Sequence, residues 1–151
     1  MVFKSFNEAI SFAIDKEQEA IDFYEMCSKE ETFSGTKQMF LDFSNEERKH
    51  IQLIENIDEK ISSSLETVSI PDLKRSNYLV DTEYKKGMGY AEILQLAMKR
   101  EEKAVQLYTD LSQNTTHQSL VQLFKQLAQE ESNHKYQLET LYDDFMAKLG
   151  D

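Results

Sequence analysis

The chain has 151 residues, one proline, four glycines, a single cysteine and a formal net charge of −11. This length suits one domain with a substantial hydrophobic core, and the low glycine and proline content permits long helices. The negative charge argues against a nucleic-acid surface, which needs clustered basic side chains. We expect a cytoplasmic protein, because the sequence shows neither a long apolar run nor a leader-like start.

Apolar residues recur at spacings of three and four along four stretches, which predicts four helices. These cover about residues 6–28, 37–60, 90–112 and 119–149, with turns at residues 32–36 and 114–118. The segment between the second and third helices, residues 61–89, contains Pro71 and is too long for a turn. At about 3.3 Å for each extended residue, it can travel the whole length of the helices. The predicted fold is therefore all-α, an antiparallel four-helix bundle with one long crossover, which is the ferritin-like connection. We also expect a short helix in residues 72–85, packed by Leu73, Tyr78 and Leu79.

The two predicted helical hairpins are copies of each other. A constant offset of 84 positions (101 − 17, 131 − 47 and 134 − 50) pairs Glu17 with Glu101, Glu47 with Glu131, and His50 with His134. The same offset pairs Tyr24 with Tyr108, Ala20 with Ala104, and Phe40 with Phe124. We interpret residues 1–151 as a single domain made by internal duplication, with repeats over about 5–60 and 90–149.

Six of the residues kept in register are of types that bind metal ions. Residues three apart lie on one helical face, so Glu47 and His50 present an oxygen and a nitrogen to one ion. Glu131 and His134 repeat this spacing. The single cysteine, Cys27, excludes a thiolate cage and is expected to be a buried core residue. Oxygen and imidazole ligands favour iron or manganese, with zinc or cobalt as adventitious substitutes. The predicted site holds two ions on Glu17, Glu47, His50, Glu101, Glu131 and His134.

Four runs of sequence resemble a known family. They are Glu17-Gln-Glu-Ala20-Ile-Asp-Phe-Tyr24, Glu101-Glu-Lys-Ala104-Val-Gln-Leu-Tyr108, Glu46-Glu47-Arg-Lys-His50 and Glu130-Glu131-Ser-Asn-His134. This pattern is similar to that of the rubrerythrin branch of the ferritin-like superfamily, over nearly the whole chain except the crossover. The resemblance implies a non-haem di-iron centre in which Glu47 and Glu131 bridge the two metals. It further implies that Glu17 and Glu101 are terminal ligands and that His50 and His134 each bind one metal.

The resemblance also implies that Tyr24 and Tyr108 hydrogen-bond the ligands, with aromatic core packing as the alternative role. Two differences from the best-known members bear on function. The chain lacks the paired Cys-x-x-Cys motifs of a rubredoxin domain, so we expect electrons from a separate donor protein. Ala104 stands where those members carry an additional glutamate, which brings peroxide-driven rearrangement of the iron ligands into question.

The favoured function is a di-iron oxidoreductase that reduces hydrogen peroxide or oxygen, through metals held by the six ligands, with a role in oxidative stress. A ferroxidase that handles iron and a structural bundle with a residual metal site are the alternatives. Met88 and the crossover tyrosines are candidates for a homodimer contact. His117 is expected to be a solvated loop residue. Glu46 and Glu130 point about 100° away from the ligands that follow them, so we expect them at the surface or around the ligands, without coordinating metal.

Overall fold

The computed structural model describes residues 3, 5–30, 35–64, 68, 73–80 and 82–150. Within these residues the chain forms four α-helices and a short 3-10 helix, without a β-strand. The helices are α1 (Phe6–Lys29), α2 (Lys37–Ser64), η2 (Arg75–Tyr78), α3 (Tyr90–Asn114) and α4 (Gln118–Gly150). The prediction of an all-α bundle is confirmed.

The ends of α1 follow from local hydrogen bonding. The Ser5 side chain accepts a hydrogen bond of 3.2 Å from the backbone N–H of Glu8, which satisfies one of the free donors of the first turn. The Glu8 carboxylate also lies in this first turn, where it complements the helix dipole. At the other end, the backbone N–H of Glu30 donates to the carbonyl of Cys27. The predicted turn at residues 32–36 lies mostly outside the described residues, and Gly35 and Thr36 lead into α2.

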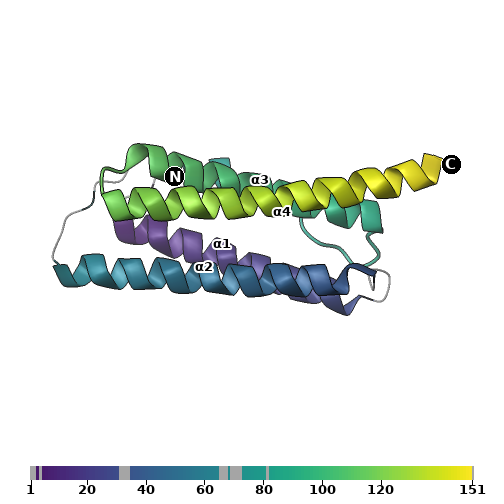
Figure 1. Ribbon diagram of the computed structural model, residues 1–151, viewed down its shortest axis with the longest axis horizontal. Coiled ribbons are helices and arrows are strands. Elements are labelled where there is room, and N and C mark those ends of the chain that lie inside the picture. Colours follow the sequence, from purple (N-terminus) through teal and green to yellow (C-terminus); the bar gives the residue numbers. More distant parts are fainter. Residues whose placement is uncertain are drawn as a thin grey trace.

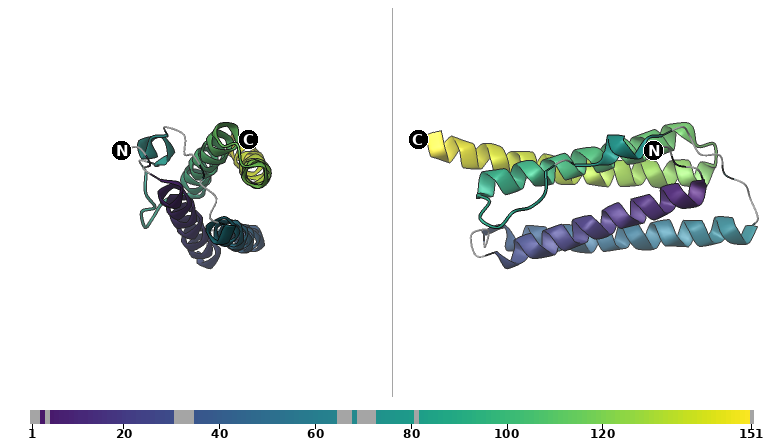
Figure 2. Two further views of the ribbon diagram at one scale, coloured as in Figure 1. Left: turned by 90° about the vertical axis from the view of Figure 1, so that its left-hand side faces the viewer. Right: turned by 180° about the vertical axis from the view of Figure 1, so that it is seen from behind.

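The two hairpins pack side by side in the topology that the sequence predicts. Helices α1 and α2 form one antiparallel pair, and α3 and α4 form the other (Figure 1). Helix α2 ends and α3 begins at opposite ends of the bundle, so α2 and α3 run in the same direction. This arrangement confirms the single long crossover between two hairpins. Part of the crossover, η2, lies beside α1 and α3 (Figure 2).

The crossover differs from the prediction in two respects. Helix α2 continues to Ser64, four residues beyond the predicted end, because Ile61 is buried and the Ser64 hydroxyl bonds its carbonyl oxygen. Among the described residues of 72–85, the predicted helix is only the single turn η2. Tyr78 in this turn is buried and donates a hydrogen bond of 2.8 Å to Asp110, but Leu79 is 45% exposed, so its predicted packing role is wrong. Pro71 lies outside the described residues.

The buried apolar residues form two clusters, and on every helix the predicted ligands lie between them. The first cluster takes residues such as Ala13 of α1 and Leu127 of α4, and the second takes Tyr24 of α1 and Leu138 of α4. Glu17 therefore separates the two clusters along α1, as Glu131 and His134 do along α4. The bundle thus carries one buried polar layer that is closed above and below by apolar packing.

Three further features concern the outside of the bundle. The C-terminal part of α4 extends past the start of α3 (Figure 1). Met88, a candidate for a dimer contact, is partly buried against the second cluster. None of the described helices combines the length and the apolar character needed to cross a membrane.

Candidate metal centre

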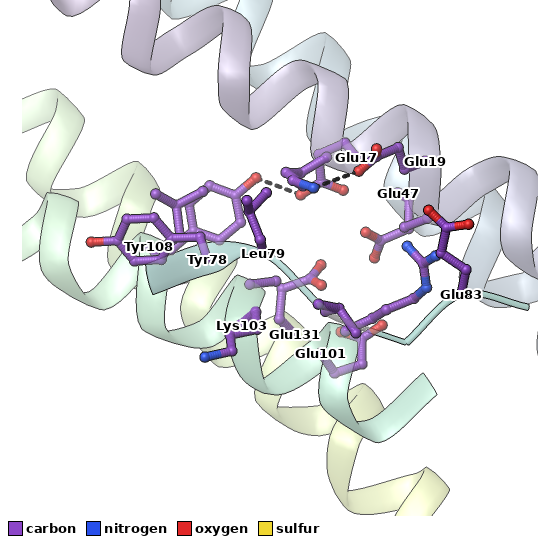
Figure 3. Close-up of a pocket in the computed structure, with 16 residues that line it drawn as sticks. Glu17, Glu19, Glu47, Tyr78, Leu79, Glu83, Glu101, Lys103, Tyr108 and Glu131 are labelled. Carbon is purple, nitrogen blue, oxygen red and sulfur yellow. Dashed lines mark hydrogen bonds and ion pairs between the residues drawn. The ribbon is translucent and has the colours of Figure 1, made fainter. Parts of the chain in front are cut away.

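The polar layer brings together all six predicted ligands. Each is at most 2% exposed. The layer receives Glu17 from α1, Glu47 and His50 from α2, Glu101 from α3, and Glu131 and His134 from α4. Glu17 and Glu47 of the first hairpin face Glu101 and Glu131 of the second (Figure 3). Residues that are far apart in the sequence therefore meet where the two hairpins pack against each other.

The six side chains form two overlapping groups of four. In one group, Glu17, Glu47, His50 and Glu131 offer ligand atoms within 4.8 Å of one another, and in the other Glu47, Glu101, Glu131 and His134 do so. Glu47 and Glu131 belong to both groups. Each group contains one imidazole, and it combines side chains from three helices. Two adjacent ions that shared two carboxylates would need this arrangement of side chains.

Both histidines direct Nδ1 toward the carboxylates. His50 Nδ1 lies 2.9 Å from Glu131 Oε1 and 3.5 Å from Glu17 Oε1. His134 Nδ1 lies 3.3 Å from Glu47 Oε1 and 3.6 Å from Glu101 Oε1. The two rings are nearly parallel, with centroids 6.5 Å apart. In each group the imidazole nitrogen and the carboxylate oxygens thus converge on one point.

The hydrogen bonding of these groups tests whether a metal fits. All six side chains have at least one buried oxygen or nitrogen without a hydrogen-bond partner among the described residues. These atoms are Glu17 Oε2, Glu47 Oε1, Glu101 Oε2, Glu131 Oε1, Nδ1 of both histidines and Nε2 of His50. Buried polar atoms are rarely left unpaired, and a bound cation would satisfy them. Hard carboxylate oxygens with two imidazoles suit divalent iron or manganese.

Without cations, the cluster retains protons. Burial raises the pKa of Glu47 well above its ordinary range, and the charges of Glu131 and Glu17 add to the effect. Burial and the charges of Glu101 and Glu17 likewise raise the pKa of Glu131. Burial alone would raise the pKa of Glu17, but its contacts with Glu47 and His50 lower it. Protons held by Glu47 and Glu131 must therefore leave when a metal binds.

The histidines also hold protons more tightly than usual. Burial acts to lower the pKa of His50, but the adjacent Glu131 and Glu17 carboxylates raise it to about 11. Burial opposes the same effect at His134, whose pKa the Glu101 and Glu131 carboxylates raise to about 9. A metal ion must displace these protons from the ring nitrogens before the imidazoles can coordinate it.

Two tyrosines connect the hairpins through the ligands. Tyr108 of α3 donates a hydrogen bond of 2.5 Å to Glu17 of α1, and Tyr24 of α1 donates one to Glu101 of α3. Burial and the neighbouring carboxylates raise the pKa of both hydroxyls well above 10. The rings also pack in the core, since Tyr24 stacks on Phe40 at 6.0 Å and Tyr108 on Phe124 at 6.1 Å. Each tyrosine therefore both packs in the core and donates a hydrogen bond to a glutamate whose role as a metal ligand stays a prediction.

A partly enclosed pocket of about 350 Å³ reaches the carboxylate side of the cluster (Figure 3). Its wall includes all four predicted glutamate ligands and Tyr108, together with the crossover residues Tyr78, Leu79 and Val80. His50 instead lines a separate depression between α2 and α4, beside Glu46 and Glu130. A small molecule that enters this first pocket would thus meet the carboxylates from a side that His50 does not line.

Four residues with predicted environments lie outside the set of six predicted ligands. Cys27 is fully buried, and burial raises the pKa of its thiol to about 12, as expected of a core residue. His117 does lie in the turn before α4, but it is half-buried rather than solvated. Glu46 and Glu130 stand outside both groups of four, although each approaches the Nε2 atom of a histidine. The sequence signal for these contacts was the doubled glutamate that precedes each ligand pair.

The fold and the buried carboxylate and histidine cluster define a ferritin-like four-helix bundle with a candidate metal site. Residues 8–144 match the family model described as Rubrerythrin, and the chain belongs to this family. No curated protein matches the chain.

Two solved structures share the fold. A hypothetical protein from Pyrococcus furiosus is 26% identical and superposes with a TM-score of 0.72, over 93% of this chain and 89% of that one. A dodecameric thioferritin, the bacterioferritin-related protein from Bacteroides fragilis, is 21% identical with a TM-score of 0.68. That match covers 94% of this chain and 86% of the other.

Proposed function

We propose that the six buried side chains hold two iron ions and that the protein is a di-iron oxidoreductase that reduces hydrogen peroxide or oxygen. The observation that carries the proposal is the pair of overlapping groups of four side chains, in which every member keeps a buried atom without a hydrogen bond. Membership of the rubrerythrin family favours iron over manganese. Zinc would fit the same ligands but does not exchange electrons, so we regard it as adventitious.

The geometry supports two kinds of ligand, bridging and terminal. Glu47 and Glu131 belong to both groups, so we assign them as bridging carboxylates. Glu17 and Glu101 each belong to one group and are assigned as terminal ligands, as are His50 and His134. Tyr108 and Tyr24 hold the terminal glutamates through their hydroxyl groups, which fixes the direction of the remaining carboxylate oxygens.

When bound, two ferrous ions supply the two electrons that convert one hydrogen peroxide and two protons into two water molecules. The pocket between α1, α3 and the crossover leads an oxidant of this size to the carboxylate side of the centre. The apolar clusters on both sides of the polar layer limit the access of bulk water. Residues 1–151 contain one cysteine, buried as Cys27, so the electrons that restore the ferrous state come from a donor outside these residues.

Oxidation of ferrous ions for transfer elsewhere is the second candidate function. Ala104 favours it, because this residue lines the pocket where the best-known rubrerythrins carry an additional glutamate. With alanine at this position, the chain would offer a bound iron one carboxylate fewer than those members do. Assembly into a homo-oligomer, as described for the dodecameric Bacteroides fragilis protein, is a further proposal, which a measurement of the mass in solution would test.

One experiment separates the two functions. The protein is loaded with ferrous ions without oxygen, and peroxide consumption is followed in the presence of a chemical electron donor. A peroxide reductase consumes many equivalents of peroxide while its iron stays bound. A ferroxidase instead takes up fresh ferrous ions and releases ferric ions, which a chelator in solution detects. Loaded protein that does neither would contradict both functions.

A further inference from the structure

Glu46 and Glu130 lie beside the histidines of the opposite hairpin. The Glu46 carboxylate, on α2, contacts Nε2 of His134 on α4. The Glu130 carboxylate, on α4, lies 3.5 Å from Nε2 of His50 on α2, which is an ion-pair contact without a hydrogen bond. These contacts occur on the outer side of each ring, because Nδ1 of both histidines faces the cluster.

These contacts can set the tautomer and the orientation of a histidine that binds a metal ion. An imidazole that binds a metal through Nδ1 must use the lone pair of that atom, so Nε2 keeps its proton. A carboxylate that accepts this proton in a hydrogen bond fixes the tautomer, orients the ring and makes Nδ1 a better donor to the metal. Glu46 is placed to act in this way on His134, and Glu130 on His50.

The duplication supports a shared role for the two glutamates. Glu46 and Glu130 are themselves 84 positions apart (130 − 46), the same offset that relates the ligands. Their side chains are 47% and 41% exposed, whereas the histidine rings that they approach are almost fully buried. Exposed ion pairs on a helix surface contribute little to stability, but a contact to a buried ring constrains that ring. Gln126 further holds Glu130 through a side-chain hydrogen bond of 3.3 Å.

We propose that Glu46 and Glu130 are positioning residues, each of which orients the histidine of the other hairpin toward the metal centre. The proposal rests on the proposed di-iron centre. It adds a second set of contacts between the two hairpins around that centre. Each ion then depends on both repeats twice, through the bridging carboxylates and through the outer carboxylate that contacts its histidine. The contact at His134 is the closer one, and Phe43 also stacks on this ring at 4.1 Å.

Metal binding to matched variants tests the proposal. Glu46→Ala and Glu130→Ala are compared with Glu46→Gln and Glu130→Gln, which keep an acceptor oxygen without the charge. Glu55→Ala removes an exposed glutamate of α2 and serves as the control. Binding of Co²⁺ to metal-free protein is titrated without oxygen, since its absorption spectrum reports the ligand geometry of each ion.

We expect each alanine variant to bind one of its two ions about 10 to 100 times more weakly, with an altered spectrum for that ion. The glutamine variants should recover most of the affinity, and Glu55→Ala should match the wild type. A general loss of folding would not be repaired by glutamine, and it would appear as a lower melting temperature of the metal-free protein.

Two results would overturn the proposal in distinguishable ways. If both alanine variants bind two ions with wild-type affinity and spectra, the glutamates do not position the histidines, although the di-iron centre stands. If the wild type itself binds no Co²⁺ or Fe²⁺, the metal centre fails and the positioning role fails with it.

Discussion

Tyr108 on α3 donates a hydrogen bond of 2.5 Å to Glu17 on α1, so a side chain of the second repeat holds a predicted ligand of the first. Tyr24 makes the reciprocal bond to Glu101. Because both bonds cross between hairpins, they connect the two halves of the polar layer directly. The tyrosines thus contribute both to the stability of the bundle and to the geometry of the proposed metal centre.

Replacing Tyr108 with phenylalanine should destabilise the metal-free protein by about 1.5–3 kcal/mol, the usual cost of losing a buried hydrogen bond to a charged group. Urea denaturation monitored by circular dichroism measures this change. Tyr136→Phe is the matched control, since Tyr136 is 71% exposed and its change should stay within about 0.5 kcal/mol. Equal stability of the two variants would show that the hydroxyl of Tyr108 contributes nothing.

The metal-free protein should become less stable as the pH rises from about 5 to 9. Burial and neighbouring charges raise the folded-state pKa of Glu47 and Glu131, and adjacent carboxylates hold His134 protonated to about pH 9 and His50 to about pH 11. The folded state therefore binds more protons than the unfolded state in this range, so the free energy of unfolding falls with rising pH. The lowered pKa of Glu17 acts in the opposite direction, but only below its ordinary value of 4.5.

Urea denaturation at several pH values, with a chelator present, checks this dependence. Glu131→Gln removes one of the two carboxyl groups whose pKa is raised. The free energy of unfolding of this variant should therefore fall less steeply with pH. Since binding displaces protons, the affinity for metal should rise over the same range. A metal-free protein whose stability increases between pH 5 and 8 would be inconsistent with these pKa shifts.

Metal ions should stabilise the fold in proportion to their occupancy. An ion at a free concentration 100 times its Kd adds about 2.7 kcal/mol for each site, provided that the unfolded chain does not bind it. The melting temperature should therefore rise with ferrous ion concentration under anaerobic conditions. The double variant Glu47→Ala with Glu131→Ala lacks both shared ligands, and it should show no such rise. An identical response in this variant would place metal binding elsewhere.

Cys27 should resist thiol reagents in the folded protein. Its side chain is fully buried, and burial raises the pKa of the thiol to about 12, so little reactive thiolate is present at neutral pH. Labelling kinetics in native buffer and in urea measure the difference. Native labelling at the rate of a free thiol would indicate that this part of the second apolar cluster opens readily.

Much of this architecture could be predicted because the duplication repeats its pattern without a gap. The spacing of apolar residues predicted α1, α3 and α4 within about two residues at each end. The sequence also indicated which side chains would meet, since Glu47 and His50 share a helical face and recur as Glu131 and His134. Their assignment as ligands is still a prediction, although the structure brings them together.

The contacts between hairpins could not be predicted, because they depend on how far apart the helices lie. Sequence spacing places Tyr24 two turns from Glu17 on α1, yet its hydroxyl reaches Glu101 on α3. The contact between Glu46 and His134 likewise requires the packing of α2 against α4. The packing of the crossover could not be predicted either, since Leu79 was expected in the core and is 45% exposed.

Counting the ions in protein loaded with ferrous iron without oxygen, then dialysed and analysed for metal, tests the central claim most directly. The wild type should hold two irons per chain, Glu17→Ala about one, and Glu47→Ala fewer than either because its carboxylate belongs to both groups. His117→Ala, in the turn before α4, should still hold two. Fewer than one iron in the wild type, or the same number in all four proteins, would contradict a di-iron centre at this position.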